Sequence, residues 1–313
     1  MKKFALAAVA AAALSAGVAQ AYTVGTFSNG VVVPNVIHNG SGETTAVGLI
    51  NGSNATIPVF WTFFDQNSKH VTDGCFGMTA NQYRGFNWSA ESGTGLEGKR
   101  GYLVFAVGGT TVGSAVVPAS DCKVASPQLV SPSQKILSAN AFHVQLGKSV
   151  AYTPVIDGPL TITPATSDLT NLHEDSLVAV AGAANRTQTL YMRYFIDGQK
   201  DGNDTRIAVW SVGNQKNTHT VNIYDDAQNR KSVNFDLAET ELSWFDPETI
   251  AGRPSNFIDG FITWNLPNSL EVTSTGPQRL FYRNTDTDGV ILSYSTIIAP
   301  AFGAVQTLLG AHR

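Results

Sequence analysis

The chain has 313 residues and a formal net charge of −4 at pH 7, and only 14% of its residues are charged, against about 25% in a typical soluble domain. A mildly acidic chain without a cluster of Lys or Arg argues against binding to nucleic acid or to an anionic membrane surface. Asn, Ser, Thr and Gly carry the polar surface instead, a composition that fits an exported β protein.

The first 21 residues predict a cleaved secretory signal peptide. Lys2 and Lys3 begin it, a short apolar run follows, and the small residues of "AQA" end it at Ala21. The apolar run is too short for a membrane-spanning helix, and no later stretch is long and apolar enough to form one. We therefore expect a secreted, periplasmic or cell-surface protein, bacterial in character, without a transmembrane span in its mature chain.

After the signal peptide, short apolar segments alternate with polar turns. The segments are rich in β-branched and aromatic residues; in chain order they include "VVVPNVI" (31–37), "VFWTFF" (59–64), "GYLVFAV" (101–107), "FHVQL" (142–146), "TLYMRYFI" (189–196), "RIAVWSV" (206–212), "HTVNIY" (219–224), "GFITWNL" (260–266) and "VILSYSTII" (290–298). Many short strands separated by turns predict an all-β fold of antiparallel sandwiches. No β-α-β alternation is present, so a parallel sheet is not expected.

Two segments 160 positions apart resemble each other. "FFDQNSK" (63–69) and "IYDDAQN" (223–229) each end an apolar run with an aromatic–Asp step and continue into a polar turn. The order of apolar runs around them also corresponds, although identity is poor and any two sandwiches share such a rhythm. We predict two tandem antiparallel β-sandwich domains of immunoglobulin-like architecture, residues 22–160 and 161–313, the second a duplicate of the first.

The duplication makes a specific prediction about the two aspartates. Asp65 and Asp225 are expected on the same hairpin of the two domains, where each side-chain oxygen caps the turn. The preceding aromatic residues, Phe64 and Tyr224, are expected to pack into the core of each domain. If the aspartates occupy unrelated strands, the duplication hypothesis fails.

Cys75 and Cys122 are the two cysteines of the chain. An oxidising compartment and an even count predict that they form a disulfide, and two buried free thiols are the alternative. Their separation of 47 residues excludes a CxxC metal or redox site.

"NTDTDG" (284–289) resembles the first half of a calcium loop. Asn284, Asp286 and Asp288 place oxygen donors at alternate positions, and a glycine follows. Ser295 stands where a bidentate acid is expected, and Asn, Asp and Gly are also the commonest hairpin residues. A plain turn is therefore the alternative to a calcium site, and calcium is the sole cofactor that the sequence suggests.

Trp88 and Trp244 are candidate ligand-binding residues. Each lies near a strand end beside polar residues, where an indole ring could stack on a sugar; the alternative is that both seal the end of a core. "GTGLEGK" (93–99) matches a dinucleotide-binding pattern but leads into a strand rather than a helix. A nucleophile elbow and closely spaced histidine pairs are absent from the sequence.

We therefore expect a non-catalytic exported protein of the cell envelope or extracellular space. It would act through self-association or through contact with an envelope or glycan surface. The first alternative is a carbohydrate-binding module that uses Trp88 and Trp244. The second is a glycan-active hydrolase whose carboxylate pair is assembled from distant loops, which a sequence does not reveal.

Overall fold

The computed structural model describes residues 25–312 except 41, 147–148, 163–167, 175, 181–188, 198–201 and 266–290. Within these residues the regular structure is β, apart from the short helix α1 (Trp88–Glu91) and the 3-10 turns η2 (Pro247–Thr249) and η3 (Pro300–Phe302). No helix of the described ranges is long and apolar enough to cross a membrane. The all-β prediction is confirmed.

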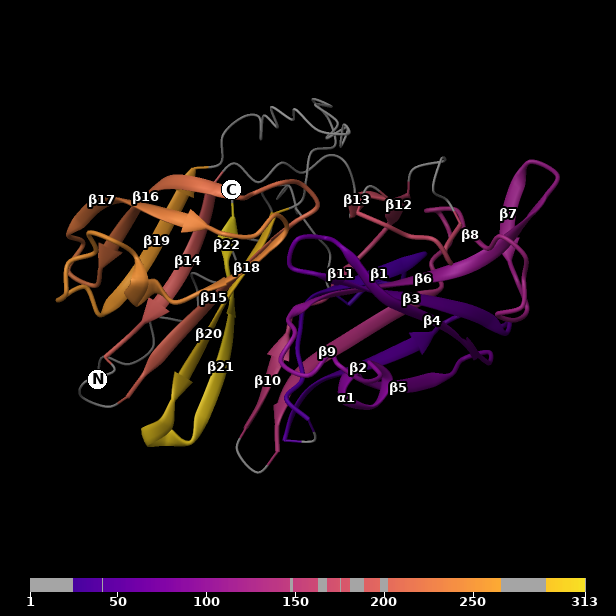
Figure 1. Ribbon diagram of the computed structural model, residues 1–313, viewed down its shortest axis with the longest axis horizontal. Helices are drawn as coiled ribbons and strands as arrows, with labels where there is room; N and C mark the ends of the chain where they lie inside the picture. Colours follow the sequence, from indigo (N-terminus) through magenta and orange to yellow (C-terminus); the bar gives the residue numbers. More distant parts are fainter. Residues whose placement is uncertain are drawn as a thin grey trace, which may run out of the picture.

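Within the described residues, four antiparallel sheets carry the fold (Figure 1), and we call them sheets 1 to 4. Sheet 1 has the order β10-β9-β2-β5 and comprises β2 (Glu43–Asn51), β5 (Tyr83–Asn87), β9 (Leu137–Gln145) and β10 (Ser149–Thr153). Sheet 2 has the order β11-β1-β6-β3-β4 and comprises β1 (Gly30–Val36), β3 (Ile57–Asp65), β4 (His70–Met78), β6 (Gly101–Val112) and β11 (Ile156–Asp157), with β7 (Ala115–Pro118) and β8 (Gln128–Leu129) paired to the far end of β6.

The second half of the chain forms sheets 3 and 4. Sheet 3 has the order β18-β15-β20-β21 and comprises β15 (Asp204–Ser211), β18 (Leu242–Phe245), β20 (Ile291–Ala299) and β21 (Ala304–Leu309). Sheet 4 has the order β17-β16-β19-β14-β22 and comprises β14 (Thr189–Phe195), β16 (Asn217–Asp225), β17 (Arg230–Leu237), β19 (Asp259–Asn265) and β22 (Ala311–His312). The two-stranded ribbon β12 (Leu160–Ile162) and β13 (Leu177–Val180) lies on the connection between the halves, and the predicted boundary at residue 160 falls within it.

Three apolar cores of described residues lie between the four sheets. Sheets 1 and 2 enclose the first core, which includes Leu49 and Phe105, and sheets 3 and 4 enclose another, which includes Ile207 and Ile262. The middle core joins the outer face of sheet 2 to the connecting segment and to the outer face of sheet 3. We refer to sheets 1 and 2 as the first sheet pair and to sheets 3 and 4 as the second.

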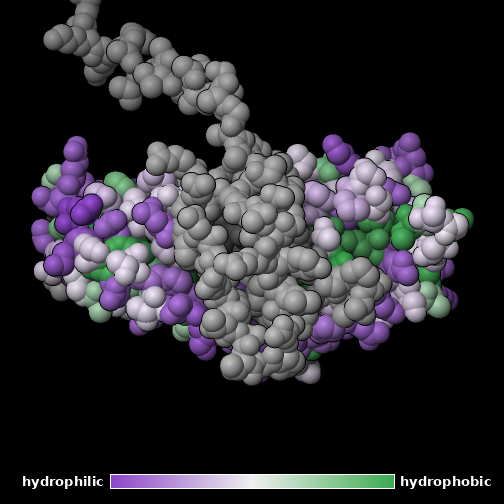
Figure 2. Space-filling view, turned by 90° about the horizontal axis from the view of Figure 1, so that it is seen from above, coloured by the Kyte–Doolittle hydropathy of each residue, from purple (hydrophilic) through white to green (hydrophobic). Residues whose placement is uncertain are grey.

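The burial pattern of each strand follows from its layer. The β3 residues are apolar at consecutive positions because Phe63 enters the first core while Phe64 enters the middle core. Strand β17 alternates instead, with Val233, Phe235 and Leu237 buried and the residues between them exposed, since the outer face of sheet 4 is open. In the coloured parts of Figure 2 hydrophilic residues predominate, and hydrophobic residues gather in limited patches.

The two sheet pairs have the same strand order. Strands β1 to β6 match β14 to β19 one by one, and β9, β10 and β11 match β20, β21 and β22. With this matching, the strand order of sheet 2 read in reverse is the strand order of sheet 4. The order of sheet 1 becomes that of sheet 3 under the same matching. Chain order and pairing therefore correspond for these strands, while β7 and β8 have no counterpart in the described part of sheet 4.

The register around the two aspartates is also the same. The residue pairs across the strands are Phe64 with Tyr102 and Asp65 with Gly101 in sheet 2, and Tyr224 with Phe261 and Asp225 with Gly260 in sheet 4. Asp65 Oδ1 accepts from the backbone N–H of Asn67 at 2.8 Å and of Lys69 at 3.0 Å, and Asp225 Oδ1 accepts from that of Asn229 at 2.7 Å. The prediction that each aspartate caps its turn is confirmed, and both lie on the hairpin between corresponding strands.

The expectation that Phe64 and Tyr224 pack into the core of each pair is wrong. Phe63 and Ile223 hold the inward positions of their strands, so the following aromatic residue points outward. Phe64 is 1% exposed in the middle core between the pairs, whereas Tyr224 is half-buried on the open face of sheet 4.

Polar contacts fix the second sheet pair against the first. The β3–β4 turn supplies Gln66, whose carbonyl accepts from the backbone N–H groups of Glu241 and Leu242, each at 3.1 Å. The buried Tyr102 hydroxyl donates to Glu241 Oε2 at 2.6 Å. Asn35 donates from Nδ2 to the Tyr294 hydroxyl at 2.6 Å. The β3–β4 turn, which follows the Phe64–Asp65 step, is thus part of the contact between the two pairs.

Candidate functional site

The Trp88 indole is a core residue and does not face solvent. It opens α1, is fully buried, and lies with its ring centroid 4.5 Å from that of Phe63 and 6.1 Å from that of Trp61. Asn87 caps the helix by accepting from the Ser89 N–H, which turns the chain so that Trp88 points inward. A sugar has no access to this ring, so the role of Trp88 is packing.

Trp244 lies in another layer, on the face of sheet 3 that meets the first sheet pair. The Arg100 guanidinium lies 4.6 Å from the centre of its ring, a cation–π geometry. Arg100 also donates to Asn35 Oδ1 at 2.5 Å. Burial lowers the pKa of Arg100 and raises the pKa of the neighbouring Tyr294 to about 12. Trp244 therefore belongs to the contact between the sheet pairs, and the structure does not bring it together with Trp88.

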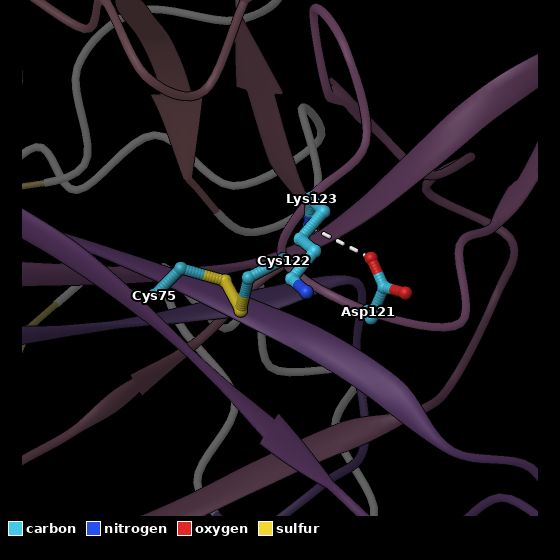
Figure 3. Close-up of a disulfide and its surroundings, with 4 residues drawn as sticks. All are labelled: Cys75, Asp121, Cys122 and Lys123. Atoms are coloured by element: carbon cyan, nitrogen blue, oxygen red, sulfur yellow. Dashed lines mark hydrogen bonds between the residues drawn. A yellow bond between two sulfur atoms is a disulfide. The ribbon is translucent and has the colours of Figure 1, made fainter.

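Cys75 and Cys122 form a disulfide, as predicted, with Cα atoms 5.9 Å apart. Figure 3 shows the bond between β4 and the segment that follows β7, where Asp121 Oδ1 accepts from the Lys123 backbone N–H at 2.7 Å. The bridge ties this long connection to an edge strand of sheet 2.

Replacing Cys75 and Cys122 by serine is expected to lower the free energy of unfolding by about 2–4 kcal/mol, because the bridge restricts the unfolded chain. Urea unfolding of the double variant and of the wild type with dithiothreitol measures the loss. An unfolding midpoint that the reductant does not move would contradict this expectation.

The calcium candidates Asn284, Asp286 and Asp288 lie outside the described residues. Within the part of the chain that the structure describes, no group of three or more His, Cys, Asp or Glu side chains is placed to hold a metal ion.

The outer face of sheet 1 presents several large apolar side chains to solvent. Tyr83 is 66% exposed on β5, and Phe142 is 40% exposed on β9. Leu146 and Val150 are exposed further along the β9–β10 hairpin. A contiguous group of exposed apolar side chains on one sheet face commonly marks an interaction surface. We call this surface the open face of sheet 1.

A groove of about 330 Å³ crosses the open face. Its floor is made of small residues, since Gly48 pairs with Gly85 and Ala46 pairs with Asn87 on neighbouring strands. A Cβ atom on Gly48 would lie 2.7 Å from the Tyr83 hydroxyl, so the tyrosine side chain extends across this glycine. A Cβ atom on Gly85 would meet nothing within 4 Å, which leaves the floor open there.

Polar side chains border the groove. Asn87 is fixed because its Oδ1 accepts from the Thr44 hydroxyl at 2.7 Å, and Asn140 stands exposed on β9. Among the residues that line the groove, Glu91 alone carries a carboxylate, and it pairs with Arg84 at 3.6 Å. Glycoside hydrolysis ordinarily needs two carboxylates across the bond. The residues that line the groove supply one such carboxylate.

The matching positions of sheet 3 are filled. Ala208, Trp210, Trp244 and Leu242 correspond by register to Gly48, Ile50, Gly85 and Tyr83. In sheet 3 the residues Trp210, Leu242 and Leu292 are at most 1% exposed, because they pack against sheet 2 in the middle core. The open face of sheet 1 is therefore the counterpart of a face that the chain itself covers at Trp210, Leu242 and Leu292.

Sequence reasoning missed Tyr83 and Phe142. Tyr83 stands in "NQYRGFN" and Phe142 in "NAFHVQ", and neither has the indole ring that drew attention to Trp88. A usable signal was the pair of glycines at positions 48 and 85 inside strands, since a strand glycine often marks close approach by another group.

Comparisons with known proteins give little further information. No family model matches the chain, and no curated protein matches it. Two structures of oxalate decarboxylase from Bacillus subtilis, one a deletion mutant and one a study of the enzyme's Mn(II) centres, match at 8% and 9% identity. Each match covers 86% of this chain and 68% of the other with a TM-score of 0.18, too low to indicate a shared fold.

Proposed function

We propose that the protein is a non-catalytic component of the cell envelope or extracellular space that acts by association through its open sheet faces. In this proposal it is exported behind a cleaved signal peptide, and its two sheet pairs are tandem, duplicated sandwich domains of immunoglobulin-like architecture. The disulfide supports an oxidising compartment. The matched strand order and register support the duplication.

The observation that carries the association is the correspondence between sheets 1 and 3. The outer face of sheet 3 packs against a neighbouring sheet through Trp210, Leu242 and Leu292. The outer face of sheet 1 has the same strands in the same register, yet Tyr83, which stands where the buried Leu242 stands in sheet 3, is exposed to water. Phe142 and Val150 are exposed on the same face. Removing such apolar area from water is favourable by about 25 cal/mol per Å². A second protein surface is the occupant that this face fits best.

Glycan binding is the second candidate function, and the groove favours it. Tyr83 and Phe142 could contact the apolar face of a sugar ring, while Asn87, Asn140 and Glu91 could bond its hydroxyl groups. The exposed aliphatic side chains of Leu146 and Val150 extend the apolar surface beyond the groove, which favours protein association.

Replacing Gly85 by glutamate is expected to weaken self-association at least about tenfold, because the contact would bury a carboxylate without a partner. Gly77→Glu is the matched control: Gly77 lies in β4 of sheet 2, and a Cβ atom there also meets nothing within 4 Å. Sedimentation equilibrium over a range of concentrations gives the association constant, and circular dichroism checks folding. A wild-type mass that stays that of a monomer at every concentration would exclude self-association, and glycan binding by that monomer would establish the second candidate.

A further inference from the structure

We propose that the occupant of the open face of sheet 1 is the outer face of sheet 4 of a second copy, so that copies join head to tail. The inference rests on the proposed association and names its partner surface. Within one chain, Trp210, Leu242 and Leu292 on the outer face of sheet 3 pack, together with the connecting segment, against the outer face of sheet 2. Sheet 1 corresponds to sheet 3, and sheet 4 corresponds to sheet 2. The same pairing of faces is therefore available between copies.

An aromatic ridge forms the centre of the covered face of sheet 2. The Phe64 and Tyr102 rings stack with centroids 5.1 Å apart and planes 17° apart. Trp210 of sheet 3 packs edge-on against Tyr102, with ring centroids 5.7 Å apart. All three side chains are 1% exposed. This ridge is what the second sheet pair covers.

Sheet 4 has the same ridge at the same positions, open to solvent. The Tyr224 and Phe261 rings stack with centroids 4.7 Å apart and planes 8° apart. They pair across β16 and β19 as Phe64 and Tyr102 pair across β3 and β6. Phe261 is 37% exposed, whereas Tyr102 is 1% exposed. This stacked pair, which Tyr191 extends with its ring centroid 6.4 Å from that of Phe261, is the part of sheet 4 that gains most from being covered.

The turn contact also has a counterpart between copies. Within the chain, the Gln66 carbonyl in the β3–β4 turn accepts from the N–H groups of Glu241 and Leu242. By register, Asp226 in the β16–β17 turn corresponds to Gln66, and Tyr83 corresponds to Leu242. A copy placed on sheet 4 in the internal geometry would bring its β4–β5 turn, with Tyr83, against the Asp226 turn.

The contact between copies would be weaker than the contact within the chain. Tyr102 donates a buried hydrogen bond to Glu241, and Phe261 cannot donate one at the same place. Thr220 and Asn222 of sheet 4 stand where Phe60 and Thr62 stand in sheet 2, so the outer face is more polar. Such a face stays soluble when it is free and still offers the aromatic ridge. A contact weaker than the internal one is expected to form reversibly.

The predicted contact joins two different faces and is therefore heterologous. A joined pair keeps one free face of each kind, the sheet 4 face of one copy and the sheet 1 face of the other, so growth continues into a ring or an open filament. A contact between two copies of the sheet 1 face would instead stop at a dimer. The two arrangements differ in which variants can still pair.

Complementary variants of the full mature chain test the head-to-tail arrangement. Gly85→Glu blocks the sheet 1 face and Phe261→Glu blocks the sheet 4 face, so each alone is expected to stay a monomer. An equal mixture is expected to form a pair that grows no further, because each variant retains the face that the other has lost. Val112→Glu is the control, since Val112 is 61% exposed at the β6–β7 hairpin and lies on neither face; it should associate as the wild type does.

Sedimentation velocity on the separate and mixed variants reads the outcome, and thermal unfolding checks that each folds. If Phe261→Glu still self-associates as the wild type does, the head-to-tail inference is overturned while the proposed association stands. If the mixture forms no pair although the wild type associates, the inference is also overturned. If the wild type itself does not associate, the proposed function fails first.

Discussion

Replacing Trp210 by alanine is expected to lower the free energy of unfolding by about 3–5 kcal/mol, the usual cost of removing a buried indole. Trp210 is 1% exposed in the middle core, where it packs against Tyr102. The cavity would open at the contact between the two sheet pairs, so their unfolding is expected to separate into two transitions. Urea unfolding followed by tryptophan fluorescence and by circular dichroism shows whether the two signals still coincide.

Trp244→Ala is the matched control for this prediction. Trp244 lies on the same face of sheet 3 but is only half-buried beside Arg100, so its loss should cost clearly less than that of Trp210. Equal losses in the free energy of unfolding for the two variants would contradict the larger contribution that burial in the middle core assigns to Trp210.

Gly101→Ala and Gly260→Ala are each expected to destabilise the protein by about 3 kcal/mol, the upper end of the usual overpacking cost. A Cβ atom on Gly101 would overlap the backbone carbonyl oxygen of Phe64, and one on Gly260 would overlap that of Tyr224. A carbonyl oxygen within a sheet cannot move aside as a flexible side chain can. Both glycines face the aromatic–Asp step of their own hairpin, so the two losses should be similar.

Gly77→Ala provides the control for both glycines, because a Cβ atom there meets nothing within 4 Å. Chemical denaturation of the three variants compares them directly. If only one of the two central glycines were sensitive, the matched register of the two hairpins would not reflect matched packing.

The sequence predicted those features that local pattern determines. Runs of β-branched and aromatic residues located the strands, the even cysteine count pointed to the disulfide, and the repeated aromatic–Asp step identified corresponding hairpins. Asp65 and Asp225 cap their turns because this depends on a few neighbouring backbone groups, which the local sequence specifies.

The features that depend on tertiary placement were not predictable in the same way. Trp88 looks exposed in "FNWSAES", yet a single helical turn capped by Asn87 directs it into the core. Phe64 and Tyr224 have the same local setting, but one is covered and the other is open. The difference arises from a sheet far away in sequence, and no local pattern carries that information. The groove depends likewise on which strands bring Gly48 beside Gly85.

The order of the layers along the chain has a consequence for synthesis. Every strand of sheets 1 and 2 lies within residues 30–157, so the first sheet pair is complete on the growing chain before β14 has been made. At that stage Val32, Phe64 and Tyr102 have no second sheet pair over them, and an apolar face of this kind invites contact with chaperones or with other nascent chains. The second half of the protein therefore covers an apolar face of the first, and a first half made without it would leave Val32, Phe64 and Tyr102 without the second sheet pair over them.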